Sequence, residues 1–263
     1  MLCLSRFQSA ALRRLFSTRP QAQRSPSALT SHPLNRDINA FDARVRSQNG
    51  EDGIIKEILF RIGFESRYVA EFGIESGVEC NSAHLLLDYD WSGLLIEGDP
   101  EFAAAAKQQY SGRRVIVHNA YVNVDNIAAI FRDHAVPRSL DLLSIDVDGN
   151  DYWMWKALGW YRPRVVVIEY NATFAPPRRW VMEYNPAHRW RGDTYFGASL
   201  SSLAVLGTQL GYALLGTDLN GVNAFFVRRD LLLLSGFPER DPERAWHRLY
   251  IDHPFGTGPA LEI

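Results

Sequence analysis

Cysteine is scarce in this sequence. The 263 residues include only Cys3 and Cys80, and Cys3 lies in an N-terminal stretch that we expect to be removed. A single remaining cysteine excludes an intrachain disulfide, which suits a reducing compartment. Long apolar runs are lacking as well, since no stretch approaches the roughly 20 residues that a membrane-spanning helix needs. The sequence therefore predicts neither a disulfide framework nor a membrane span.

Acidic residues are absent from the first 36 positions, which contain six arginines. Arg6, Arg13, Arg14 and Arg19 alternate with apolar residues at near-helical spacing, and serines follow. An arginine-rich, acid-free amphipathic segment is typical of a mitochondrial transit peptide. We therefore interpret residues 1–36 as a targeting segment and linker, and we expect the protein in the mitochondrial matrix. The alternative is a basic tail without a targeting role.

The rest of the chain is acidic. From Asp37 onward it has 22 basic and 30 acidic residues, a net charge of -8. This excess disfavours a nucleic-acid partner, because the phosphate backbone would be repelled. We assign residues 37–67 to an N-terminal helical segment, residues 68–230 to the main domain and residues 231–263 to a C-terminal tail.

Apolar runs alternate with helical patterns through the main domain. Strands are predicted at residues 68–73, 91–96, 114–118, 140–145 and 164–168. Helices are predicted at residues 48–62, 81–87, 99–110, 126–134, 150–160 and 198–210. Nearly continuous apolar strands that alternate with helices predict a parallel sheet covered on both faces. The last two strands, at residues 212–216 and 223–227, are joined by so short a connection that they must be antiparallel.

The first predicted strand ends in a glycine loop. Glu71-Phe-Gly73 closes the strand, and Gly77 precedes a helix start at Asn81, which is the order of a nucleotide-binding turn. A dinucleotide loop would read Gly-x-Gly-x-x-Gly, and that pattern is missing here. Three acids surround the glycines: Glu71, Glu75 and Glu79. They would repel a diphosphate and attract a cation such as a sulfonium, which disfavours an NAD-dependent oxidoreductase.

Carboxylates also gather after the fourth predicted strand, in the run Asp146-Val-Asp-Gly-Asn-Asp151. Ligands of open α/β sheets bind at the carboxyl ends of the strands, and buried charge is costly unless it is paired or metal-bound. One interpretation is a magnesium or calcium site with Asp146, Asp148 and Asp151 as candidate ligands. The alternative is a hydrated turn that caps the next helix.

Four motifs resemble those of class I S-adenosylmethionine-dependent methyltransferases. Glu71-Phe-Gly73 resembles their first motif, and Leu94-Leu-Ile-Glu97 resembles the second, an acid at the tip of the second strand. The runs 141–149 and 163–169 resemble the fourth- and fifth-strand motifs of the FkbM-like branch. The resemblance covers about residues 47–228. It implies a doubly wound, mostly parallel, Rossmann-like α/β sheet with a C-terminal antiparallel hairpin, and S-adenosyl-L-methionine as cofactor.

The resemblance also implies roles for residues around the cofactor. Glu97 would accept both ribose hydroxyls. Glu71, or the run Asn81-Ser82, would hold the methionine end, although Asn81 suits helix capping equally well. Asn119-Ala120 would lie beside the adenine. The candidate cofactor-binding residues are Glu71, Gly73, Gly77, Asn81, Glu97, Gly98, Asn119 and Asp146.

The acceptor end is predicted less completely. A hydroxyl acceptor must lose its proton, for which Asp148 is the first candidate base and Glu169 the second; Asp146 would then contact the cofactor amine. The aromatic and arginine-rich insertion 171–196 could cover the cleft as a lid or pack as an irregular segment. We expect methyl transfer to an oxygen of an unidentified hydroxyl or carboxyl acceptor. The alternative is a mitochondrial binding or assembly protein that kept the fold and lost catalysis, and the oligomeric state stays open.

The N-terminal segment generates the first prediction. Fused to a fluorescent reporter, residues 1–36 should carry it into mitochondria, whereas the full protein without them should stay cytosolic. Fluorescence microscopy and fractionation measure both. Mitochondrial location of the shortened protein would contradict the assignment.

Overall fold

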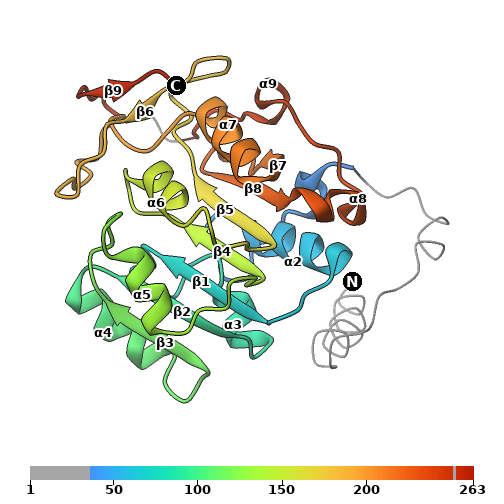
Figure 1. The fold of residues 1–263 in the computed structure, drawn as a ribbon, viewed down its shortest axis with the longest axis vertical. Helices are drawn as coiled ribbons and strands as arrows, with labels where there is room; N and C mark the ends of the chain where they lie inside the picture. Colours follow the sequence, from blue (N-terminus) through green and yellow to red (C-terminus); the bar gives the residue numbers. More distant parts are fainter. Residues whose placement is uncertain (1–35, 251–252) are drawn as a thin grey trace, which may run out of the picture.

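A seven-stranded sheet forms the middle layer of the molecule (Figure 1). The structure, a computed structural model, describes residues 36–250 and 253–263. The sheet has the order β3-β2-β1-β4-β5-β8-β7, and its strands are β1 (Tyr68–Phe72), β2 (Ser92–Glu97), β3 (Val115–Asn119), β4 (Leu142–Ile145), β5 (Val165–Glu169), β7 (Tyr212–Thr217) and β8 (Asn223–Arg228). The first five are parallel, and β8 is antiparallel to both neighbours. This order confirms the predicted class I methyltransferase fold.

Helices cover both faces of the sheet, so two apolar cores form. One face is covered by α2 (Glu51–Ile62), α3 (Ala83–Asp88) and α4 (Pro100–Gln109). The other is covered by α5 (Ile127–Asp133), α6 (Asp151–Ala157) and α7 (Leu200–Leu210). Local sequence sets several helix ends: Asp99 accepts hydrogen bonds from the first turn of α4, and Ser199 does so for α7. None of the described helices is long and apolar enough to cross a membrane.

Several short elements were not predicted. They are η2 (Ile38–Phe41), η3 (Arg229–Leu231), α8 (Leu232–Ser235), α9 (Pro242–Ala245), β6 (Val181–Met182) and β9 (Ala260–Leu261). Strands β6 and β9 pair with each other as a second, antiparallel sheet. Elements of two to four residues are too short to show a hydrophobic period, so the sequence carried no signal for them. The segment beyond residue 230 packs onto the domain, where Phe237 and Ala245 are buried.

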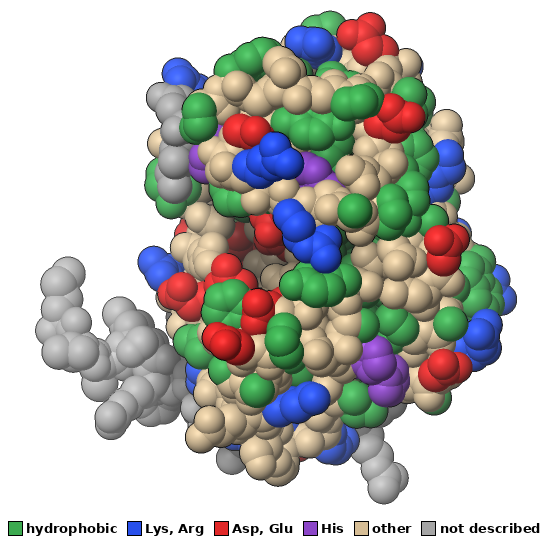
Figure 2. Space-filling model, turned by 90° about the vertical axis from the view of Figure 1, so that its left-hand side faces the viewer, with side chains coloured by type: hydrophobic (Ala, Val, Ile, Leu, Met, Phe, Trp, Pro, Cys, Tyr) green, Lys and Arg blue, Asp and Glu red, His purple; other side chains and the backbone are tan. Residues whose placement is uncertain are grey.

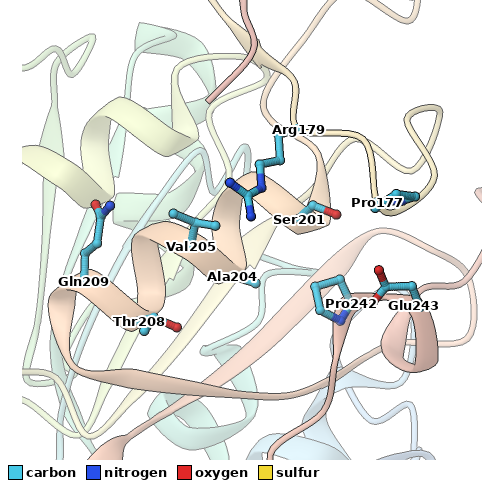
Figure 3. Close-up of a pocket in the computed structure, with 9 residues that line it drawn as sticks. All are labelled: Pro177, Arg179, Ser201, Ala204, Val205, Thr208, Gln209, Pro242 and Glu243. Carbon is cyan, nitrogen blue, oxygen red and sulfur yellow. The ribbon is translucent and has the colours of Figure 1, made fainter.

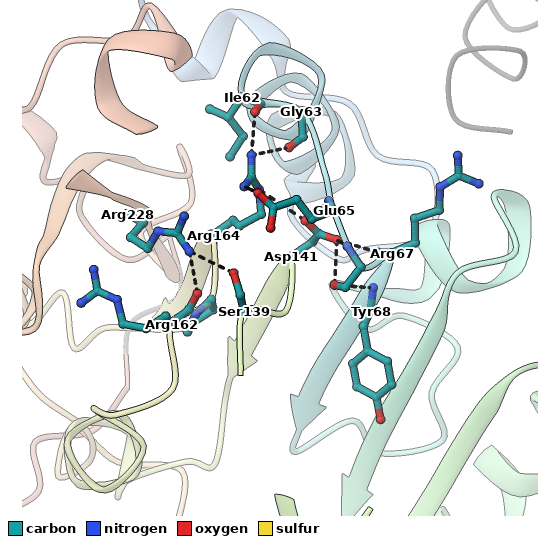
Figure 4. Close-up of polar contacts among 12 residues, drawn as sticks. Ile62, Gly63, Glu65, Arg67, Tyr68, Ser139, Asp141, Arg162, Arg164 and Arg228 are labelled. Carbon is teal, nitrogen blue, oxygen red and sulfur yellow. Dashed lines mark hydrogen bonds and ion pairs between the residues drawn. The ribbon is translucent and has the colours of Figure 1, made fainter. Parts of the chain in front are cut away.

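A buried ionic network joins the amino-terminal ends of β1, β4 and β5 (Figure 4). Asp141 is fully buried and accepts hydrogen bonds from the backbone N–H groups of Glu65, Ser66 and Arg67 at 2.6–2.8 Å. Arg164, also buried, donates to the carbonyl oxygen of Ile62 at 2.7 Å, and its Nε lies 3.4 Å from Asp141 Oδ1. The network ties the end of α2 to the start of three central strands, at the sheet edge opposite their carboxyl ends.

Removal of the Asp141 carboxylate should destabilise the fold. Asp141→Ala leaves the buried Arg164 guanidinium with only the exposed Glu65, at 2.6 Å, as its counter-charge and frees three backbone donors. The free energy of unfolding should therefore fall by about 3–5 kcal/mol. Urea denaturation measures it. As the control, Arg44→Gln removes an exposed ion pair with Glu79 and should cost less than about 0.5 kcal/mol. If the two variants lose similar free energy of unfolding, the buried network contributes no more to stability than an exposed ion pair does.

Candidate active site

The carboxyl ends of the parallel strands open into a cleft. Its volume is about 140 Å³, and its walls come from the loops after β1 to β4 and from residues 186–190. Viewed from this edge, the molecule shows a hollow with acidic side chains inside and arginines along its rim (Figure 2). Among the predicted site residues, Gly73, Glu97, Gly98 and Asp148 line it.

Three carboxylates meet beside this cleft. Asp146 follows β4, Asp148 lies two residues later, and Glu169 ends β5; each offers an oxygen, and the three oxygens lie within 4.8 Å of one another. Asp148 has a φ of +51°, a left-handed conformation of the kind often held at functional sites. Glu169 Oε2 is shielded from solvent and has no hydrogen-bond partner in the described part of the chain. Among residues 36–250 and 253–263, no basic side chain forms an ion pair with the acidic trio of Asp146, Asp148 and Glu169.

Burial and repulsion from nearby carboxylates raise the pKa values of all three members of the trio. Burial raises the pKa of Asp146 well above its usual range, and repulsion from Asp148 and Asp151 adds to it. Burial, followed by the charge of Asp146, likewise raises the pKa of Glu169. Loss of hydration, followed by the charges of Glu75 and Glu97, raises the pKa of Asp148. Such groups either keep a proton near neutral pH or share a cation.

Asp151 requires a correction. The sequence placed it among the metal-ligand candidates, but Asp151 is fully buried, is bonded to the loop that precedes α6, and is not among the carboxylates whose oxygens converge. Its two oxygens accept from the backbone N–H groups of Val147 at 2.8 Å and Gly149 at 3.0 Å. Burial raises the pKa of this fully enclosed carboxyl to about 7. Glu169, brought in by β5, takes the third place in the acidic trio.

Glu71 also has a structural task. Both of its oxygens cap α3, accepting from the backbone N–H groups of Asn81 and Ser82 at 2.8 Å, and the Ser82 hydroxyl donates at 2.5 Å. The Asn81 side chain donates to Ser144 Oγ at 3.1 Å. The cap for α3 thus comes from Glu71 rather than from the Asn81 side chain, and neither residue lines the cleft.

Glu97 combines a structural contact with free acceptor capacity. Oε2 accepts from the Glu75 N–H at 2.7 Å and Oε1 from the Asp99 N–H at 2.8 Å, which orients the carboxylate at the cleft wall. A carboxylate has about four acceptor positions, so two remain for a ligand. Two adjacent hydroxyls of a ribose would match them.

Packing between loops explains the predicted glycines. A Cβ on Gly73, whose φ is +75°, would lie 1.5 Å from the Asp146 carbonyl oxygen. A Cβ on Gly77 would meet the Tyr110 ring at 2.7 Å, and one on Gly98 would meet the Tyr121 ring at 2.2 Å. The three glycines therefore allow close contact between neighbouring segments. Gly73 and Gly98 also line the cleft.

Asn119 links two loops. Its Nδ2 donates to the carbonyl oxygens of Glu97 at 2.8 Å and Gly98 at 3.0 Å, so the side chain holds the ends of β2 and β3 together. The neighbouring residues Ala120 and Tyr121 reach the cleft. Of the predicted pair Asn119-Ala120, Ala120 therefore lines the cleft, and Asn119 fixes the loops beside it.

The insertion 171–196 is both packed and part of the cleft. Asn150 and Asn185 exchange two hydrogen bonds, and Trp153 Nε1 donates to the Met182 carbonyl at 2.9 Å, which fastens the insertion to α6. Its residues Pro186, His188, Arg189 and Trp190 line the cleft. The insertion therefore packs as an irregular segment and also forms part of the cleft wall, so the two alternatives offered by the sequence are compatible.

His188 is a cleft residue that the sequence did not indicate. Burial lowers the pKa of its imidazole, and its Nε2 has no partner among the described residues. Arg189 beside it stacks on Tyr121, with the guanidinium carbon 3.9 Å from the ring centroid. A segment without periodicity gave no reason to single out either residue.

Comparisons with known proteins give structural likeness only. No family model and no curated protein matches the chain. It is similar to an S-adenosylmethionine-dependent methyltransferase from Clostridium acetobutylicum, at 8% identity and a TM-score of 0.44 over 68% of this chain and 92% of that one. It is also similar to a putative O-methyltransferase from Klebsiella pneumoniae, at 13% identity and a TM-score of 0.43 over 85% and 97% of the two chains. The strand order, rather than these distant likenesses, defines the fold.

The buried Glu169 carboxylate predicts an unusual pH dependence of stability. Its pKa in the folded state lies above the unfolded value, so ionisation opposes folding and stability falls as pH rises through that window. Glu169→Gln should therefore raise the melting temperature of the ligand-free protein at pH 8 and change it little at pH 4. Thermal unfolding in metal-free buffer measures this. A melting temperature that Glu169→Gln lowers at pH 8 would contradict it.

Proposed function

We propose that this protein is an S-adenosylmethionine-dependent methyltransferase that methylates an oxygen of an acceptor. The observation that carries the proposal is a shared cleft: Glu97 and Asp148 line the same walls, and Asp148 belongs to the acidic trio. A ribose-binding acid and a proton-accepting cluster thus open into one space, at the sheet edge where open α/β folds bind ligands.

The cleft residues fit the cofactor. When bound, S-adenosylmethionine supplies an electrophilic methyl group on a positively charged sulfur. Glu97 keeps acceptor positions for the ribose hydroxyls, and the negative field of the trio favours a cation nearby. The chain's own contribution is to align donor and acceptor, which can supply about 7–11 kcal/mol of the barrier reduction.

The acidic trio supports the acceptor end of the proposal. Asp148 is the one member that lines the cleft, and its raised pKa makes it a stronger proton acceptor than an ordinary aspartate. Asp146 and Glu169 lie beside it and would pass on or share the proton. A hydroxyl or carboxyl oxygen held near Asp148 would then be the nucleophile.

A divalent cation is the alternative way to balance the trio. Three carboxylates from β4, its following loop and β5 are the donor set that magnesium or calcium prefers. The unpartnered Glu169 Oε2 is the observation that favours it. Asp146, Asp148 and Glu169 would hold the ion, which would lower the proton affinity of a bound acceptor oxygen.

A second function from another class is a binding or assembly protein that keeps the cofactor site without turnover. The free acceptor capacity of Glu97 would serve both functions equally, whereas the uncompensated trio is needed only for chemistry. We also infer a mitochondrial address from the arginine-rich segment 1–36, nearly all of which lies outside the described residues.

Loss of the Glu97 charge should weaken cofactor binding. Glu97→Gln removes charge-assisted hydrogen bonds to the ribose hydroxyls, so affinity for S-adenosylhomocysteine should fall about 10- to 100-fold. Titration calorimetry measures this. Glu101→Gln is the matched control, because Glu101 is an exposed acid on α4 that does not line the cleft. This variant should bind S-adenosylhomocysteine with the affinity of the wild type. Equal affinity in all three proteins would reject Glu97 as the ribose ligand.

A pair of measurements separates base from metal. If Asp148 is the base, Asp148→Asn should lower transfer of labelled methyl groups into a mitochondrial extract by about 10²–10⁴ without changing cofactor affinity, and a chelator should have no effect. If a cation is held, chelation should abolish transfer and magnesium should restore it. Calorimetry should then detect magnesium or calcium binding that Glu169→Gln weakens. Wild-type transfer in both Asp148→Asn and Glu169→Gln would show that neither is the base.

A further inference from the structure

A second cavity lies on the outer side of α7, away from the cleft (Figure 3). We call it the α7 groove. Its floor is one stripe of the helix, formed by Ser201, Ala204, Val205 and Thr208. These positions are spaced i, i+3, i+4 and i+7, so their side chains share a face. The groove holds about 360 Å³, which is more than the cleft, and the two cavities share no lining residue.

The walls of the groove come from two segments far apart in sequence. Pro177 and Arg179 of the insertion form one side, and Pro242 and Glu243 at the start of α9 form another. Prolines, alanine and valine make most of the surface apolar. A volume of 360 Å³ is at the lower end of small-molecule sites, which points to a small ligand rather than a protein segment.

Two polar groups in the groove lack partners. Ser201 is 6% exposed, and its Oγ has no hydrogen-bond partner among the described residues. In Figure 3 this hydroxyl points from α7 toward the side formed by Pro177. Arg179 extends its guanidinium over the helix toward Val205 (Figure 3), and within residues 36–250 and 253–263 no hydrogen bond or ion pair engages it. Its neighbour Arg178, by contrast, pairs with Glu262 at 3.9 Å.

We propose that the α7 groove binds a small amphipathic carboxylate. The carboxylate would pair with the Arg179 guanidinium, whose planar fork matches its two oxygens. The Ser201 hydroxyl would donate to the same end after a rotation about χ1, and the apolar body would cover Ala204 and Val205. Because Glu243 forms part of the wall, a dianion such as phosphate is disfavoured and a single negative charge at the Arg179 end is favoured.

The experiment uses 3-phenylpropionate as the probe and 3-phenylpropionamide, its uncharged isostere, as the matched ligand. Ligand-observed NMR titrations of the full chain, with the cleft saturated by S-adenosylhomocysteine, measure both affinities. The carboxylate should bind at least about tenfold more tightly than the amide, because only the carboxylate forms charge-assisted bonds. Arg179→Gln should remove this difference, whereas Arg178→Gln should preserve it.

A second variant tests the location without touching the charge. Ala204 is partly exposed on α7, so Ala204→Leu should fold and fill the groove, and it should abolish binding of both compounds. Absence of carboxylate binding at millimolar concentrations would overturn the proposal. So would binding that Ala204→Leu leaves intact, or a loss that is equal in Arg178→Gln and Arg179→Gln. Cofactor affinity, measured in the same samples, reports on the cleft separately.

Discussion

Repulsion among carboxylates at one edge of the sheet is the constraint on which the site depends. The parallel strands β1, β2, β4 and β5 all end at this edge, and each carries an acid within one residue of its end. A parallel arrangement brings these chain-distant acids together regardless of their mutual repulsion. The fold must therefore compensate each charge with donors, with a proton or with a bound cation.

These acids differ in how many backbone N–H groups donate to them. The difference separates acids that hold loops in place from acids that are candidates for the proposed reaction. Glu71 and Asp151 are each held by two backbone N–H groups, so they stabilise the loops in which the site is built. Glu97 is held in the same way but stays at the cleft wall with acceptor positions to spare. Asp146 and Glu169 accept from no such backbone groups among the described residues, and burial, followed by repulsion from neighbouring carboxylates, raises their pKa values well above the usual range. The acids at this edge without such donors are therefore the candidates for the reaction proposed above.

At the opposite, amino-terminal edge of the sheet, a buried carboxylate is fully surrounded by donors. Asp141 is as deeply buried as any acid of the chain's described part, yet backbone donors, the Ser66 hydroxyl and Arg164 all face it. That carboxylate fastens β4 to the start of β1 and leaves no capacity for a ligand. The same residue type thus anchors the sheet at one edge and is exposed to chemistry at the other, because the local donors differ. The α7 groove is a cationic counterpart, because Arg179 lines it and forms no ion pair within the described residues.

The sequence by itself determined the order and type of the main elements. Apolar runs and turn residues are local signals, so the five parallel strands, the final hairpin and the acids at the strand tips could be read directly. Which of those acids is free could not be read, because it depends on backbone N–H groups from other loops. Only tertiary structure assigned Asp151 to its own loop and brought Glu169 into the trio, and only it placed His188 in the cleft. Periodicity reports which face of an element is buried, whereas the partner of a charge is chosen by segments that meet across the fold.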